Sequence, residues 1–304
     1  MGRIEKRVCI VVLAAFLLAL GAMLLQTLLS GDSPTIYHIT ILLDGSDEAY
    51  WQNFRLGADR AARDRNADVR YITRYEGAAA GAQAAALRQA WEGETDGVVL
   101  FPLDRALLEA ALEDAPAGLA VTAVGAPLES GRVDCVISAD PEEMGRRLAD
   151  ALAADGHTAV TLYRSAQETE TLALRRQGFL RRLEELGVRC TTVTTSPQGL
   201  FVLPEGRAAA ALEPAMTEAL CQATSSPGQV YGIGSSDLLL HYLEEGSAAA
   251  LVVQSDYEAG YLSLLSVLEA LENGRPQDQT LDCYTVTAEN LFTDPMDQIL
   301  FPSV

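Results

Sequence analysis

Residues 41–62, ILLDGSDEAYWQNFRLGADRAA, contain the unit that decides the fold: an apolar run, an acidic loop and a helical pattern. The apolar run stops at Leu43, and Tyr50 and Trp51 stand side by side where the helical pattern begins. A short apolar run bounded by polar residues is typical of a buried strand, which in a parallel sheet is followed by a helix. The stretch therefore predicts a strand–loop–helix unit with two large aromatic residues after the strand.

The same alternation of strand and helix continues along the chain. Further strands are predicted at 69–73, 97–101, 119–124, 134–138, 159–163, 190–195, 230–233 and 250–253. Helical patterns lie between most of them, for example at 51–65, 78–91, 105–115, 141–154, 172–186 and 258–271. Near-continuous apolar strands separated by amphipathic helices indicate an α/β fold whose parallel sheet is covered on both faces. Ligands of such folds bind at the carboxyl ends of the strands.

An uncharged apolar run occupies residues 8–29 and follows Arg3, Lys6 and Arg7. About 20 apolar residues span a bilayer, and basic flanks stay on the cytoplasmic side. We therefore expect residues 1–32 to form a cytoplasmic tip and a single transmembrane helix, with the remaining chain extracytoplasmic. A cleaved signal peptide is the alternative, although its apolar region is usually only ~7–15 residues long.

Charge and reactive residues argue against several functions. The formal net charge of −20 repels phosphate backbones, so we expect no nucleic-acid partner. His38, His157 and His241 are isolated in the sequence, so no metal site, cofactor or enzymatic activity is indicated. None of the five cysteines forms a Cys-x-x-Cys pair, and we expect buried free thiols, with a disulfide left open.

The connection after the strand at 190–195 has two interpretations. Residues 196–199 form a tight turn, which is too short for the crossover that joins parallel strands. Residues 200–203 either pair back as a hairpin or form a loop that leads into a helix at 207–224. Pro214 would kink that helix.

The order of these segments resembles the type I periplasmic sugar-binding proteins, the ribose- and galactose-binding family that also supplies the ligand domain of lactose-repressor-like regulators. The resemblance covers about residues 35–291. It is carried by the opening stretch and by DGVVLFPLDRALLEAAL, VDCVISADPEEMGRRLADAL, LRRQGFLRRLEELG, VYGIGSSDLLLHYLEEGSAAALVVQSDYEAGYLSLLSVLEALENGRP and TVTAENL. The resemblance implies two doubly wound parallel-sheet lobes joined by three hinge strands. The predicted N-terminal transmembrane helix precedes them.

The resemblance also implies where the chain crosses between lobes. The expected crossings are near 138–140, 254–255 and 284–287. The N-terminal lobe would then hold residues 33–138 and 255–284, and the C-terminal lobe residues 139–254 and 285–304. Ligand would bind between the lobes and be buried when they close.

The first loop supplies four of the expected ligand-binding residues. By the resemblance, Tyr50 and Trp51 lie at the mouth of the cleft, where an aromatic plane suits the C–H face of a sugar ring. Alternatively, one of the two turns inward and packs against the helix. Asp47 and Glu48 either bind ligand hydroxyls or place negative charge near the start of the helix.

Three further residues are candidates at other strand and helix ends. Asp104 either reaches the cleft or caps a helix. Arg175 matches the sugar-clamping arginine of the family, and a guanidinium offers a fork of donors; simple solvation of a basic helix, together with Arg176, is the alternative. Gln254 lies on the second hinge crossing, where the family places an amide or an acid against the ligand.

The chain departs from the family at two expected anchors. Gly125-Ala126 stands where an Asp-Arg pair is common, and Gly232-Ile233-Gly234 stands where Gly-Phe-Asp is common. A buried ligand hydroxyl without a partner costs about 1–3 kcal/mol, so the usual ribose or glucose pose is not expected. The ligand instead binds weakly, differs from those sugars or reaches other acids such as Asp237 or Asp256.

These features together predict a membrane-anchored, extracytoplasmic solute-binding protein for a small polar ligand, most simply a saccharide. It would deliver the ligand to an ATP-driven (ABC) importer. The alternative is a sensor whose liganded lobes dock on a receptor histidine kinase.

Overall fold

The computed structural model describes residues 12, 14–23, 35–43, 51–73, 81–166, 168–199, 201, 203, 206–224, 226–272 and 274–302. The chain divides into two units, residues 1–36 and 37–304. In the first unit, residues 14–23 are helical. No helix within the described ranges has both the length and the apolar character needed to cross a bilayer. Residues 8–11, 13 and 24–29 of the predicted anchor lie outside those ranges, so the anchor stays a prediction.

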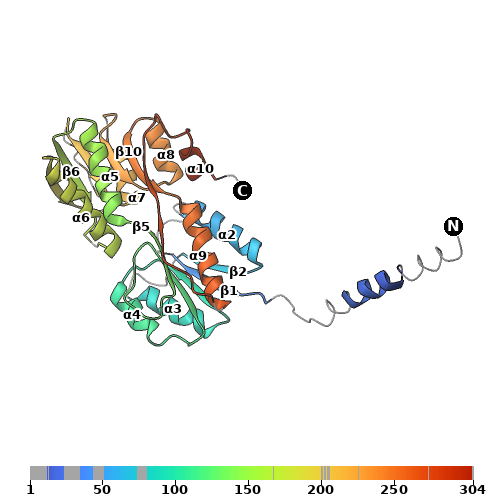
Figure 1. The fold of residues 1–304 in the computed structure, drawn as a ribbon. Coiled ribbons are helices and arrows are strands. Elements are labelled where there is room, and N and C mark those ends of the chain that lie inside the picture. Colours follow the sequence, from blue (N-terminus) through green and yellow to red (C-terminus); the bar gives the residue numbers. More distant parts are fainter. Residues whose placement is uncertain are drawn as a thin grey trace, which may run out of the picture. The chain divides into compact units, whose positions relative to one another are not determined.

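The first sheet of the second unit is parallel throughout and has the strand order β11-β5-β4-β3-β1-β2. Its strands are β1 (His38–Leu42), β2 (Asp68–Ile72), β3 (Gly97–Leu100), β4 (Ala120–Val124), β5 (Cys135–Ala139) and β11 (Gln279–Leu281). The helices packed around it are α2 (Gln52–Arg65), α3 (Ala82–Glu92), α4 (Arg105–Leu112) and α9 (Asp256–Leu271). We call this part the first lobe (Figure 1).

The second sheet has the order β12-β10-β9-β8-β6-β7, and β12 alone runs antiparallel to its neighbour. Its strands are β6 (Ala159–Arg164), β7 (Arg189–Thr194), β8 (Ala208–Ala211), β9 (Val230–Ile233), β10 (Ala248–Gln254) and β12 (Cys283–Val286). Its helices are α5 (Pro141–Ala154), α6 (Glu170–Glu185), α7 (Pro214–Ala223), α8 (Asp237–Glu244) and α10 (Met296–Leu300). This part is the second lobe, and the predicted α/β fold with two parallel-sheet lobes is confirmed.

The chain crosses between the lobes three times in the described segments (Figure 1). It leaves the first sheet after β5, and Asp140 caps α5 by accepting from the backbone N–H groups of Glu142 and Glu143. It leaves the second sheet after β10, and Ser255 caps α9 in the same way. The third crossing lies at Asp282, between β11 and β12, which is earlier in the chain than the predicted 284–287.

Each lobe contains a pair of helices that cross at glycine. A Cβ on Gly57 of α2 would lie 1.9 Å from the Tyr257 carbonyl oxygen of α9, and a Cβ on Gly260 would lie 2.0 Å from the Phe54 carbonyl oxygen. In the second lobe, Gly145 of α5 meets the carbonyl oxygen of Arg175 on α6, again at 2.0 Å. Gly178 meets the carbonyl oxygen of Glu142 in return. Because glycine has no side chain, these backbones approach to contact.

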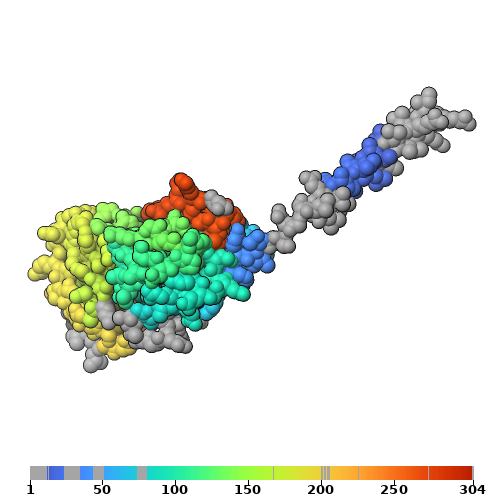
Figure 2. Space-filling model, turned by 90° about the horizontal axis from the view of Figure 1, so that it is seen from below, coloured from blue at the N-terminus to red at the C-terminus, as the bar shows by residue number. Residues whose placement is uncertain are grey.

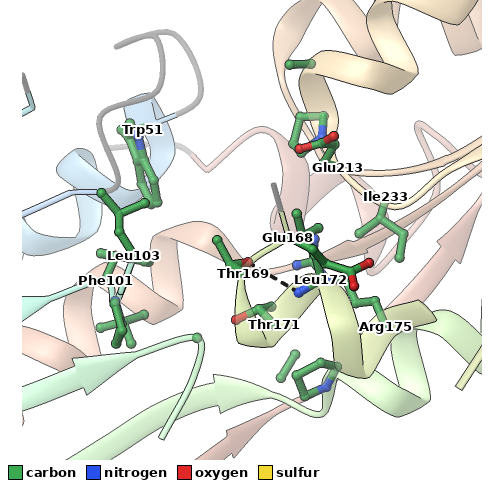
Figure 3. A pocket seen from close by; sticks show the side chains of 18 of the residues that line it. Trp51, Phe101, Leu103, Glu168, Thr169, Thr171, Leu172, Arg175, Glu213 and Ile233 are labelled. Atoms are coloured by element: carbon green, nitrogen blue, oxygen red, sulfur yellow. Dashed lines mark hydrogen bonds between the residues drawn. The ribbon is translucent and has the colours of Figure 1, made fainter. Parts of the chain in front are cut away.

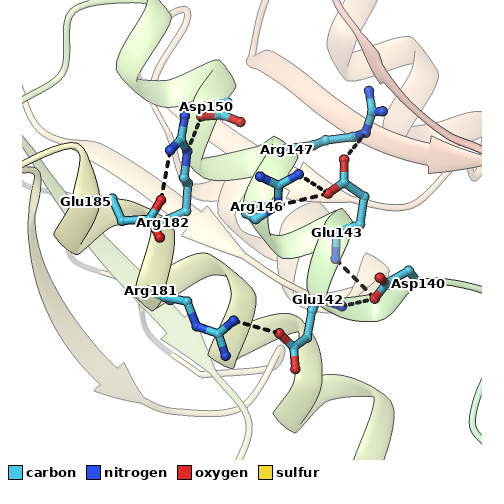
Figure 4. A network of polar contacts seen from close by, with 9 residues as sticks. All are labelled: Asp140, Glu142, Glu143, Arg146, Arg147, Asp150, Arg181, Arg182 and Glu185. Carbon is cyan, nitrogen blue, oxygen red and sulfur yellow. Dashed lines mark hydrogen bonds and ion pairs between the residues drawn. The ribbon is translucent and has the colours of Figure 1, made fainter.

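Ion pairs join the outer surfaces of the α5–α6 crossing (Figure 4). Arg182 of α6 binds Asp150 of α5 at 2.6 Å and Glu185 at 2.8 Å, and Arg181 binds Glu142 at 3.3 Å. Such exposed pairs contribute only about 0–1 kcal/mol each. The close backbone contact at the glycines therefore does more than the ion pairs to set the position of α6.

The predicted helix at 207–224 is wrong in its first part. Residues 208–211 form β8, which lies between β6 and β9, and helix α7 begins only at Pro214. Alanine favours helix in isolation, but all four alanines of β8 are buried by neighbours in the interior of the sheet. Pro214 occupies the first turn of α7, where its missing N–H costs nothing.

Candidate ligand-binding cleft

A cavity of about 860 Å³ lies between the lobes, at the carboxyl ends of strands from both sheets. Its size falls within the ~300–1,000 Å³ that small-molecule sites occupy. The face drawn in Figure 2 shows the green to teal surface of the first lobe adjoining the yellow-green surface of the second. At this boundary, Arg105 of α4 lies 3.9 Å from Glu170 of α6, so α4 and α6 approach each other beside the cavity.

The first lobe supplies a wall that is mainly apolar, formed by Trp51, Phe101, Pro102, Leu103 and Leu107. Trp51 lines the cavity and also packs edge-on against Phe101, with ring centroids 4.3 Å apart (Figure 3). Its ring lies 5.9 Å from that of Phe54 in the core. The two interpretations of Trp51, cleft residue and packing residue, therefore describe two faces of one side chain.

Gln83 of α3 holds the loop that carries this apolar wall. Its Nε2 donates to the Phe101 carbonyl at 2.6 Å, and its Oε1 accepts from the Leu103 N–H at 2.9 Å. The side chain is buried and lines the cavity. Sequence reasoning missed Gln83, because a glutamine within an alanine-rich helix gives no local sign of its partners.

Asp104 stands at the rim of the cavity and caps α4. Its Oδ1 accepts from the Leu107 N–H at 3.1 Å, so the capping interpretation holds. The residue also lines the cavity, which leaves ligand contact as a proposal.

Arg175 of α6 is the only basic residue that lines the cavity in the described chain. One of its terminal nitrogens donates to the Leu212 carbonyl at 2.9 Å, while its buried Nε has no hydrogen-bond partner among the described residues. Burial lowers the pKa of Arg175 to about 10, and the charges of Asp256 and Glu213 oppose that shift. A buried N–H without an acceptor costs about 1–3 kcal/mol. A ligand oxygen that accepted from the guanidinium of Arg175 would therefore be favoured.

Two carboxylates lie on the same polar wall as Arg175 and already accept hydrogen bonds. Asp256 accepts from Ser235 Oγ at 2.5 Å and from Gln254 Nε2 at 3.1 Å, and burial raises its pKa. Glu213 Oε1 accepts from Ser165 Oγ at 2.5 Å. The structure thus brings Gln254 into the cavity, with its amide turned toward Asp256.

The family is decided by the match of a whole domain. Residues 39–276 match the family model described as a periplasmic binding protein domain. This chain belongs to that family. Its members bind solutes and are not enzymes, and the predicted resemblance is confirmed. Among curated proteins, none matches the chain.

Solved structures with the same fold include sugar-binding proteins and a regulator. A carbohydrate transporter solute-binding protein from Agrobacterium radiobacter, in complex with D-arabinose, has a TM-score of 0.74 at 19% identity and covers 88% of this chain and 100% of its own. A solute-binding protein from Agrobacterium vitis with bound D-fucose has a TM-score of 0.76 at 16% identity, covering 87% and 100%. A LacI-type regulator from Bacteroides fragilis has a TM-score of 0.71 at 16% identity, covering 84% and 99%.

In this periplasmic binding protein domain, the two family departures both lie on the cavity surface. Gly125, Ile233 and Gly234 line the cavity. Asp256 lines it too, as one of the two acids expected to compensate, whereas Asp237 is exposed on α8 and does not. Of the residues expected to bind ligand, Asp47, Glu48 and Tyr50 lie outside the described residues.

Several polar residues of the cavity were not predicted. Ser165, Glu213 and Ser235 follow β6, β8 and β9, and all line the cavity. The sequence does not single out Glu213, because its pattern predicts a helix from residue 207 to residue 224. The signal that could have revealed it is the Glu-Pro pair, since proline is common at the first position of a helix and the preceding residue then follows a strand.

Proposed function

We propose that this chain is an extracytoplasmic solute-binding protein that closes its two lobes around a small polar ligand of the saccharide type. The observation that carries the proposal is the pairing of walls: the aromatic and aliphatic side chains around Trp51 and Phe101 face the polar groups around Arg175 (Figure 3). A sugar presents an apolar ring face and a set of hydroxyls, and the two walls match both. The D-arabinose and D-fucose bound by structural neighbours support this ligand class.

We further propose that the ligand is delivered to an ABC importer and that residues 1–32 anchor the protein in the cell membrane. The apolar run at 8–29 and its basic flank support the anchor. Intact-mass measurement of the protein in the membrane fraction tests it: a mass that includes residue 1 or 2 supports the anchor, and a mass lacking the apolar run contradicts it.

The saccharide function is tested by thermal unfolding of the full chain in detergent with pentoses, hexoses, polyols and nucleosides. Free ligand at 100 times its Kd stabilises the folded protein by about 2.7 kcal/mol, which raises the melting temperature by several degrees. A rise with at least one sugar supports the proposal. The absence of any rise across the whole panel contradicts it.

A sensor that docks on a receptor histidine kinase is the second candidate. The glycines at 125 and 234 favour it, because they leave the site with fewer polar side chains for a sugar. Nutrient uptake does not require such a reduced site. Photo-crosslinking from the lobe surfaces in cells separates the two: recovery of a permease supports import, and recovery of a kinase supports sensing.

A further inference from the structure

The ionisable residues on the cavity wall suggest a charge preference, an inference that rests on the proposed saccharide function. Among the described residues, the cavity is lined by the acids Asp104, Glu168, Glu213 and Asp256 and by a single base, Arg175. The excess of acids is reduced by pairings within the protein, and these decide which charges a ligand meets.

Glu168 is compensated by a partner behind it. The Nε of Arg176 and one of its terminal nitrogens bind the two carboxylate oxygens, both at 2.9 Å. A terminal nitrogen of Arg164 also lies 3.9 Å from Oε1 of Glu168. The negative charge of Glu168 is therefore neutralised by Arg176, and Glu168 adds no net charge to the cavity wall.

Arg175 is compensated as well, and more than once. Glu213 and Asp256 both stabilise its charged form, and its terminal nitrogen is bound to the Leu212 carbonyl. Glu213 balances the charge of Arg175, Asp104 adds a negative charge at the rim, and Asp256 adds another whenever it is ionised. An anion that bound Arg175 would share the cavity with the carboxyl groups of Glu213, Asp256 and Asp104, and repulsion between like charges is strong in a partly dehydrated cavity.

Glu213 has capacity left for a ligand donor. Its Oε1 accepts from Ser165, and within the described chain no donor is seen at Oε2. Asp256 differs, because both of its oxygens already accept hydrogen bonds, from Ser235 and Gln254. A hydroxyl or an ammonium of the ligand would thus donate to Glu213 in preference to Asp256.

We propose that the cleft selects its ligand by charge: it binds neutral and amino sugars, rejects sugar acids and sugar phosphates, and uses Glu213 to make the distinction. The ligand class is a polyhydroxylated ring that is neutral or carries one ammonium group. Arg175 serves as a donor to hydroxyl oxygens and not as a clamp for an acidic group.

Sugars of one ring configuration that carry a neutral, a basic or an acidic substituent test the proposal. Affinities of the full chain for galactose, galactosamine and galacturonate, and for the three corresponding glucose derivatives, are measured by calorimetry at low salt and at a pH where the amine is protonated. The methyl esters of the acids serve as neutral controls, which are larger than the acids by one methyl group. We expect each acid to bind at least ~10-fold more weakly than its ester, a gap of about 1.4 kcal/mol.

Replacement of one carboxylate then assigns the effect. Glu213→Gln should narrow the gap between acid and ester at least ~3-fold and weaken amino-sugar binding. Glu185→Gln is the matched control, because Glu185 pairs with Arg182 on the outer surface of α6, and the gap should not change.

The outcomes separate this inference from the proposed function. Equal or tighter binding of an acid than of its ester overturns the charge selection and leaves the saccharide function standing. An acid–ester gap that is unchanged in Glu213→Gln overturns the assignment to Glu213. No binding by any sugar of either series, in agreement with a flat thermal panel, overturns the saccharide function and the inference with it.

Discussion

The two walls of the cleft differ in chemistry although the two lobes that carry them are built alike. Each lobe is a mainly parallel sheet with a pair of helices crossed at glycine, α2 with α9 in the first and α5 with α6 in the second. The first lobe presents aromatic and aliphatic side chains, whereas the second presents Glu168, Arg175 and Glu213 (Figure 3).

The crossing helices of the two lobes also differ in their relation to the cavity. In the second lobe, the contact of Gly145 with the backbone of Arg175 positions the residue whose side chain lines the cavity. In the first lobe, the equivalent contact of Gly57 falls on Tyr257, which is not part of the cavity lining. The same packing device therefore supports the ligand site in one lobe and only the fold in the other.

The largest effect is expected from Arg175→Met, which removes the donor of the polar wall. Charge-assisted hydrogen bonds contribute about 1.5–3 kcal/mol, so the affinity for the best-binding sugar should fall roughly 10- to 100-fold. Arg181→Met is the control, since Arg181 pairs with Glu142 on the outside of the lobe. Sugar affinity is measured by calorimetry for both variants. Equal affinities would show that Arg175 does not bind the ligand.

The two glycine crossings are compared by Gly145→Ala and Gly57→Ala. In both, the added Cβ would lie about 2 Å from a backbone oxygen, so each should lower the free energy of unfolding by about 1–3 kcal/mol. Only Gly145→Ala displaces the backbone of Arg175, and only this variant should also lose affinity, by about tenfold when assayed below its melting temperature. A similar loss of affinity in Gly57→Ala would show that the crossings act alike.

On the apolar wall, Trp51→Ala should weaken binding by roughly 3- to 10-fold, the ~0.5–1.5 kcal/mol of an aromatic contact. Trp91→Ala is the matched control, because Trp91 is also half-buried in the first lobe but does not line the cavity. Binding is measured by calorimetry for both. Unchanged affinity in Trp51→Ala would assign Trp51 to packing against Phe54 and Phe101 only.

A pH effect on stability should distinguish the polar wall from the apolar one. Burial raises the pKa of Asp256, so the folded protein holds this proton more firmly than the unfolded chain. Its contribution to stability is therefore full below the ordinary aspartate pKa of about 4 and is lost as the pH rises through the raised value. Asp256→Asn should melt at a higher temperature than the parent at neutral pH, and the difference should vanish in acid. A lower melting temperature of Asp256→Asn than of the parent at neutral pH would contradict the prediction that the buried charge of Asp256 destabilises the folded protein.

The smallest effect is expected at the rim, where Asp104 caps α4. Asp104→Asn keeps a capping oxygen and should change sugar affinity by less than about twofold, whereas Asp104→Ala should lower the free energy of unfolding by about 1 kcal/mol. A large loss of affinity in Asp104→Asn would place this carboxylate in direct contact with the ligand.

By itself, the sequence determined the alternation of strands and helices and the cap at Asp140, and it offered a cap at Asp104 as one of two alternatives. The family resemblance placed Trp51, Arg175 and Gln254 among the candidates for the cleft. These follow from local signals: apolar periodicity, a capping acid before a helix, and motifs at known positions of a family. Such signals act over a few residues, so they remain readable in one dimension.

Only the tertiary structure decided that 208–211 is a strand and that Glu213 therefore lines the same cavity as Arg175. Four alanines favour a helix locally, and their strand conformation is imposed by β6 and β9 on either side. Glu213 and Asp256 line the same cavity as Arg175 because the carboxyl ends of β8 and β10 lie at the same edge of the sheet. Residues 43 positions apart are brought together by strand order, which no local pattern contains.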